Sequence, residues 1–152
     1  MLRKLKISGL LIVTAFCFLS CNTTAQNKKN KISEIQSVTL TNTYGRGGTT
    51  TIKATKDSLI SENNSIASKE IPTFKRKITG EEWNLILNSI NLDKIKLTKS
   101  GKSQGYYDGP DEIFEISTKD KKYTLTNASD STNYKQLKNL KVLLRNMVSQ
   151  NK

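Results

Sequence analysis

The chain has 152 residues, with 25 lysines and arginines against 13 aspartates and glutamates, giving a formal net charge of +12. Histidine is absent, and the only cysteines are Cys17 and Cys21. This composition excludes His-dependent serine or cysteine triads, zinc sites built from Cys and His, and a disulfide in any domain after the cysteines.

The N-terminus predicts a signal peptide over residues 1–20. Arg3, Lys4 and Lys6 form a positively charged start, and residues 7–19 are almost entirely apolar. The apolar run is too short to span a bilayer comfortably, and a strongly polar segment follows it. Loss of this leader leaves 22 basic against 13 acidic residues, a net charge of +9.

The residues Phe18-Leu19-Ser20-Cys21 resemble the lipobox of bacterial lipoproteins, in which a small residue precedes the cysteine that receives the lipid. This resemblance implies lipid attachment at Cys21, anchoring to a bacterial membrane in the cell envelope, and a polar tether over residues 21–31. The other interpretation is ordinary cleavage after Ala25, at the end of a small-x-small pattern. The mature protein would then be soluble in the periplasm or secreted.

Short alternating apolar runs after residue 32 predict a meander of about four antiparallel strands. The first is expected around Val38 and Leu40, before a glycine-rich turn. Residues 49–55 and 58–62 predict the second and third strands. A fourth is expected within residues 65–78, where a proline favours an edge position or a bulge.

The clearest local signal is a capping box formed by Thr79 and Glu82. Apolar residues then recur at steps of three and four, which predicts an amphipathic helix. Its buried stripe comprises Trp83, Ile86, Leu87 and Ile90.

A short strand and a loop are expected next. Leu92, Ile95 and Leu97 predict the strand, and residues 98–110 form a glycine-rich loop. The loop contains Gly101-Lys102-Ser103, but it lacks the earlier glycine of a phosphate-binding loop and no helical pattern follows. Nucleotide binding is therefore not predicted.

The remaining residues predict a hairpin and a second helix. Residues 111–118 and 122–126 alternate on either side of a turn, as hairpin strands do. Asp130 or Ser131 is expected to cap the final helix. Its apolar stripe comprises Tyr134, Leu137, Leu140, Leu144, Met147 and Val148.

These elements predict an α+β fold. An antiparallel β-meander and a hairpin would form one sheet, with two amphipathic helices packed on one face, because this arrangement buries every apolar stripe. The length predicts a single domain, expected over residues 32–150.

Basic residues near two tyrosines suggest a contact site for an anion or a glycan, through charge and stacking. Its candidate residues are Lys94, Lys96, Lys99, Lys102, Tyr106 and Tyr107. The alternative is a solvated lysine-rich face. Asp108, Asp111 and Glu112 cluster three carboxylates that would suit Ca²⁺, although their spacing does not match an EF-hand and a plain turn is the other interpretation.

The lipobox, the Lys/Asn/Ile-rich composition and the sequence of residues 77–83 resemble small uncharacterised lipoproteins of Bacteroidota. The resemblance implies no activity. It does imply a possible glycosylation chemistry, because members of that phylum glycosylate Asp-Ser/Thr-apolar or Asp-Ser/Thr-Thr sequences. Ser58 and Ser131 lie in such triplets.

The sequence thus predicts a non-catalytic envelope lipoprotein, an interaction module for a protein or glycan. No cofactor and no nucleic-acid partner is expected, and the scattered carboxylates do not predict an enzyme. The alternative is an electrostatic binder of anionic polysaccharide or lipid through a lysine-rich face.

Overall fold

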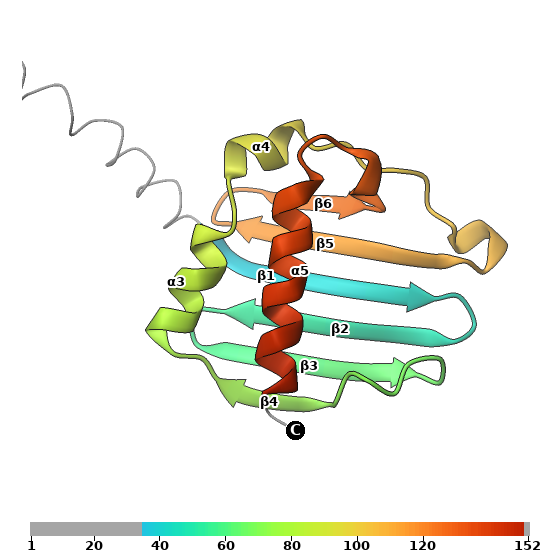
Figure 1. Ribbon diagram of the computed structural model, residues 1–152, viewed down its shortest axis with the longest axis horizontal. Coiled ribbons are helices and arrows are strands. Elements are labelled where there is room, and N and C mark those ends of the chain that lie inside the picture. The colour runs from blue at the N-terminus through green and yellow to red at the C-terminus, as the bar shows by residue number, and fades with distance from the viewer. Residues whose placement is uncertain (1–34, 151–152) are drawn as a thin grey trace, which may run out of the picture. The chain divides into compact units, whose positions relative to one another are not determined.

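Six strands form one antiparallel sheet in the order β4-β3-β2-β1-β5-β6 (Figure 1). The protein is described by a computed structural model over residues 35–150, apart from the side chain of Asp130. The strands are β1 (Ile35–Tyr44), β2 (Gly48–Thr55), β3 (Ser58–Ser65), β4 (Phe74–Lys77), β5 (Pro110–Thr118) and β6 (Lys122–Thr126).

Helices pack on one face of this sheet. They are α3 (Gly80–Asn88), α4 (Leu92–Leu97) and α5 (Tyr134–Ser149), with single 3-10 turns at η1 (Gly105–Tyr107) and η2 (Ala128–Asp130). Helix α5 crosses the strands, and α3 lies beside it (Figure 1). The predicted α+β class, with the meander, the hairpin and the two longer helices, is confirmed.

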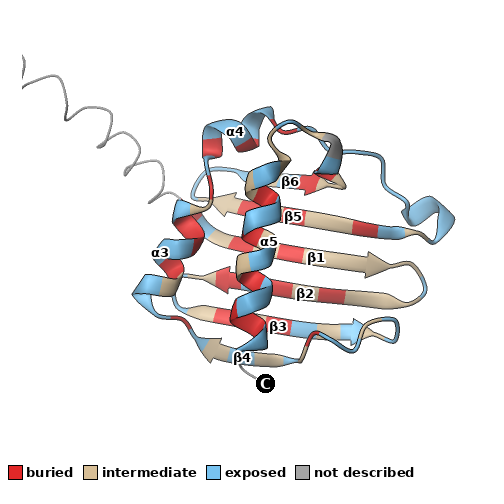
Figure 2. Ribbon diagram, viewed as in Figure 1, coloured by how far each residue is buried: buried red, intermediate tan, exposed pale blue. Residues whose placement is uncertain are grey.

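Buried and partly exposed side chains alternate along the central strands, because one face of the sheet packs against the helices and the other faces solvent. The register places Leu40 between Ile52 on β2 and Phe114 on β5, and all three side chains are buried under the helices. Their neighbours Thr41 and Thr51 face the other side and are partly exposed. Figure 2 shows buried and partly exposed positions alternating along the central strands.

Both predicted amphipathic helices contribute the expected residues to the core. Helix α3 buries Trp83, Ile86 and Leu87, and it begins at the predicted capping box. The Thr79 Oγ1 accepts from the Glu82 amide at 3.1 Å, and the Thr79 amide donates to Glu82 Oε2 at 2.8 Å. Helix α5 buries a stripe of Leu137, Leu140, Leu144, Met147 and Val148.

The strand predicted at residues 92–97 is wrong, because this segment is helix α4. The Asn91 side chain caps it by accepting from the Lys94 amide at 3.1 Å. Leu92 and Ile95 are buried, whereas Leu97 is 72% exposed. The burial therefore follows a three-residue step along one face of a helix, not the two-residue step of a strand.

The predicted cap of the last helix is also wrong. Asp130 lies in the turn η2, and Ser131 lies in the connection after it. Helix α5 begins only at Tyr134, after Asn133, whose side chain makes no capping hydrogen bond. The Tyr134 amide instead donates to the carbonyl of Ser131 at 2.9 Å, which closes a further turn before the helix.

Candidate functional site

Two adjoining open clefts run along the loop that follows α4. The first has a volume of about 330 Å³ and the second about 660 Å³. Both are lined by Gly101 and Asn127, and we call the pair of clefts the furrow. The first is also lined by Leu97, Lys99, Ser100, Ala128, Ser131 and Thr132, and the second by Lys102, Gln104, Pro110, Glu112 and Ser129.

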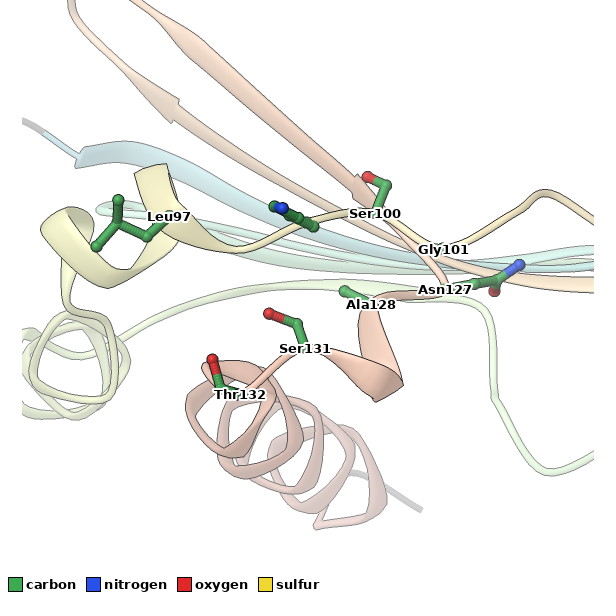
Figure 3. Close-up of a pocket in the computed structure, with 8 residues that line it drawn as sticks. Leu97, Ser100, Gly101, Asn127, Ala128, Ser131 and Thr132 are labelled. Carbon is green, nitrogen blue, oxygen red and sulfur yellow. The ribbon is translucent and has the colours of Figure 1, made fainter.

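The walls of the furrow come from segments far apart in the sequence. Figure 3 shows Leu97 at the end of α4, Ser100 and Gly101 on the loop, and Ser131 and Thr132 just before α5. The loop forms one wall, and the connection from β6 to α5 forms the other.

Gly101 brings the two walls together. Its amide donates to the Thr126 carbonyl at 2.8 Å, and the Thr126 amide donates to Ser100 Oγ at 3.1 Å. These two bonds attach the loop to the end of β6. A Cβ at position 101 would lie 2.4 Å from the Asn127 carbonyl oxygen, so only glycine fits this close approach.

Asp111 holds the next part of the loop. Its carboxylate, 7% exposed, accepts from Ser103 Oγ at 2.5 Å, from the Gln104 amide at 2.7 Å and from Asn127 Nδ2 at 2.6 Å. The hydrogen bond from Ser103, followed by that from the Gln104 amide, lowers the pKa of Asp111 below its usual value, although burial opposes the shift. The carboxylate therefore stays ionised at neutral pH.

Asn127 completes the connection between the walls. Its backbone is left-handed, with φ of 46°, a conformation that asparagine tolerates better than most residues. Its Oδ1 accepts from the Glu112 amide at 2.8 Å, and its Nδ2 also donates to the Lys102 carbonyl at 2.9 Å. These bonds hold the backbone of Glu112 and of Lys102, two residues that line the second cleft.

Glu112 points the opposite way from Asp111, toward α5. It accepts from the Tyr134 hydroxyl at 2.7 Å and pairs with the ammonium of Lys141. Burial, reinforced by the Glu112 carboxylate, raises the pKa of Tyr134 to about 12, so the phenol stays protonated. The negative charge that Glu112 brings to the second cleft is therefore already compensated by Lys141.

The structure does not bring together the three carboxylates predicted as a Ca²⁺ site. Asp108 pairs with Arg46 at 3.1 Å, Asp111 is enclosed by its donors, and Glu112 faces the helices. Within residues 35–150 no three Asp, Glu, Cys or His side chains cluster closely enough to hold a metal ion. Adjacent residues of a strand point to opposite faces, which explains the separation of Asp111 from Glu112.

The predicted lysine patch is divided among different places. Lys99 lines the first cleft of the furrow and Lys102 the second. Lys94 lines another cleft, beside the start of α5, and Lys96 pairs with Asp93 at 3.7 Å.

The two predicted tyrosines lie at the tip of the loop, in η1. Tyr106 is 90% exposed and Tyr107 79%, and their rings meet edge to face with centroids 5.0 Å apart. The tip rests against the β1–β2 turn, where a Cβ on Gly45 would lie 2.2 Å from the Asp108 carbonyl oxygen. Because the loop is fixed at both ends, it presents the tyrosines on an ordered support.

The two serines of the predicted glycosylation triplets have different surroundings. Ser58 begins β3, where its Oγ lies 3.0 Å from Thr55 Oγ1. Ser131 lines the first cleft and is partly exposed. Their glycosylation stays a prediction. Cys21, the signal peptide over residues 1–20 and the tether over residues 21–31 lie outside the described residues.

Sequence reasoning missed Asn127 and Gln104 as parts of the site. Asn127 directly follows β6, and an asparagine at the end of a strand is a recognisable turn signal. Gln104 carries no such signal, because backbone contacts hold it in place: its amide donates to Asp111, and its carbonyl accepts from the amides of Tyr107 and Gly109.

The furrow offers ammonium, amide and hydroxyl groups, a set suited to holding a polar ligand by hydrogen bonds and charge.

Within residues 35–150 no helix is long and apolar enough to cross a bilayer. No protein-family profile matches this chain, and no curated protein is significantly similar to it in sequence.

Proposed function

We propose that this chain is a non-catalytic lipoprotein of the bacterial cell envelope that binds a glycan in the furrow. The leader and Cys21 support the location, and the furrow supports the activity. The main observation behind this proposal is that one loop both lines the polar furrow and carries two exposed tyrosines. The Asp111 carboxylate ties this loop to the sheet.

The chemistry of the furrow favours a glycan over an apolar ligand or peptide. Sugars present many hydroxyl groups, which pair with side chains that both donate and accept, such as those of Gln104 and Ser129. Exposed aromatic rings offer flat apolar faces against which a sugar ring can stack, and Tyr106 lies only two residues beyond Gln104. The alternative, electrostatic attachment through a broad lysine face, has less support because Lys94 lies at another cleft and Lys96 pairs with Asp93.

Glycan binding is tested with the full chain, purified in detergent, against polysaccharides released from the bacterial envelope. We expect Y106A/Y107A to weaken binding about tenfold, or about 1.4 kcal/mol, because the variant loses both exposed ring faces. Gln104→Ala should weaken it about threefold, as expected for one lost hydrogen bond. The measurement is titration calorimetry.

The matched control for this experiment is Leu85→Ala, which removes a side chain 56% exposed on α3. It should bind like the unaltered protein. Unchanged affinity in both Y106A/Y107A and Gln104→Ala would remove the furrow from the proposal, and failure to bind any envelope glycan would remove the function itself.

The location is tested by lipid labelling in a bacterial host. We expect the full chain to incorporate radiolabelled palmitate and to stay with the membrane fraction after a high-salt wash, because several acyl chains give stable anchoring. Cys21→Ser should lose both properties, whereas the control Cys17→Ser should keep them. A mature protein that begins at Gln26 by mass would show cleavage after Ala25 instead.

A further inference from the structure

Each cleft of the furrow contains one lysine. Lys99 lines the first and Lys102 the second, and the contact between Gly101 and Asn127 separates them. Within residues 35–150 neither ammonium forms a salt bridge, whereas Lys96, Lys122 and Lys141 each pair with a carboxylate.

Among the lining residues, whose side chains the structure describes, only Glu112 has a carboxylate, and it does not face these two lysines. Glu112, which lines the second cleft, is held by Lys141 and Tyr134 on its helix side. Asp111 lies behind the loop and is occupied by Ser103, Gln104 and Asn127. Among the described side chains, none therefore compensates the positive charge of Lys99 in the first cleft or of Lys102 in the second.

The backbone carrying the two lysines is fixed. The Gly101 amide donates to the Thr126 carbonyl at the end of β6, and the Lys102 carbonyl accepts from Asn127 Nδ2. Lys99 and Lys102 line different clefts, and Gly101 and Asn127 lie where the two clefts adjoin. A ligand that meets each charge in its own cleft therefore carries acid groups on separate units.

We infer that the glycan bound in the furrow is acidic, with one anionic group against Lys99 and another, on a different sugar unit, against Lys102. This inference rests on the proposed function and names the ligand class of the same site. In the first cleft Ser131 and Thr132 supply hydroxyl groups to the sugar, and Ser100, whose Oγ accepts from the Thr126 amide, still has its hydroxyl hydrogen to donate. In the second cleft the side-chain amide of Gln104 supplies a donor and an acceptor to the sugar.

The test compares polygalacturonate and dextran sulfate, which carry carboxylate and sulfate groups, with neutral dextran. The full chain in detergent should bind at least one acidic polymer about tenfold more tightly than dextran. Lys99→Ala and Lys102→Ala should each weaken that binding about threefold and K99A/K102A about tenfold. Salt should weaken binding as well, since screening acts over about 8 Å at physiological ionic strength.

The control K56A/K138A removes the same total charge from exposed positions on the β2–β3 turn and on α5. It should change the affinity less than twofold. An equal loss in this control would overturn the inference, because the attraction would then depend on net charge alone.

The remaining outcomes separate the inference from the proposed function. Equal affinity for dextran would overturn the acidic preference and leave glycan binding standing. Binding to none of the polymers, together with binding to vesicles of anionic phosphatidylglycerol, would overturn both in favour of a lipid surface. Binding to neither polymers nor vesicles would also overturn both.

Discussion

Replacing Glu82 by alanine is expected to lower the free energy of unfolding by about 2–3 kcal/mol, below the roughly 3–5 kcal/mol for a fully buried ion pair because both side chains are partly exposed. Glu82 accepts from Arg76 Nη2 at 2.6 Å and from Nη1 at 3.0 Å, and both side chains are 22% exposed. The same carboxylate accepts from the Thr79 amide. Its loss leaves the Arg76 guanidinium without its counter-ion and opens the start of α3.

Urea denaturation followed by circular dichroism measures this change. The control is Glu81→Ala, which removes a neighbouring carboxylate that is exposed and should cost no more than about 0.5 kcal/mol. A double-mutant cycle with Arg76→Ala should give a coupling free energy above about 1 kcal/mol. Equal stability of Glu82→Ala and Glu81→Ala would show that the ion pair between β4 and α3 contributes nothing measurable.

The same pair predicts how stability depends on pH. The hydrogen bond from Arg76 is the main cause that lowers the pKa of Glu82 from 4.5 to about 2. A lowered folded-state pKa means that the stabilisation is complete above pH 4.5 and is lost as the pH falls toward 2. The loss should be about 3 kcal/mol at most. Glu82→Gln should flatten this part of the stability curve, and an unchanged slope would contradict the assignment.

Replacing Asp111 by alanine is expected to cost about 3 kcal/mol and to abolish glycan binding. The change leaves the Ser103 hydroxyl, the Gln104 amide and the Asn127 side chain without their shared acceptor, and an unsatisfied buried group costs roughly 1–3 kcal/mol. Because these three groups fix the loop to the end of β5, the second cleft should lose its shape.

Hydrogen exchange at the Gln104 amide reports this effect directly. Exchange should accelerate strongly in Asp111→Ala, because the amide loses its partner, while amides in the centre of β1 should change only with global stability. Asp108→Asn is the matched control, since it removes an exposed charge from the same loop and asparagine tolerates the left-handed backbone of this position, with φ of 55°. Normal protection at Gln104 in Asp111→Ala would show that the loop is held by other contacts.

Much of the fold could be predicted from local spacing. Trp83, Ile86 and Leu87 lie on one helical face, and the capping box fixes where that helix begins. Helix α4 was missed because it is only six residues long, so its apolar residues suit a strand almost as well. Its cap, Asn91, was the available signal.

The site was predictable only in part, because it depends on contacts across the chain. Lys99 and Lys102 were identified, but their division between two clefts follows from the approach of Gly101 to Asn127. Asp111 was interpreted as a possible metal ligand, since sequence alone does not reveal that donors from the loop and from beyond β6 surround it. Lys94 was grouped with the others because α4, which carries it to another cleft, was read as a strand.

The position of β1 in the sheet has a consequence for how the chain folds. The meander from β1 to β4 joins neighbours in sequence, so it forms through short loop closures. The other edge of β1 pairs with β5, which places Leu40 opposite Phe114, and both shorter helices and the long loop separate these two strands in the chain. Such distant pairings slow folding. While β5 is not yet paired, one edge of β1 exposes unpaired backbone N–H and C=O groups that another extended chain can bind. We expect this partly folded sheet to be the state most prone to aggregation.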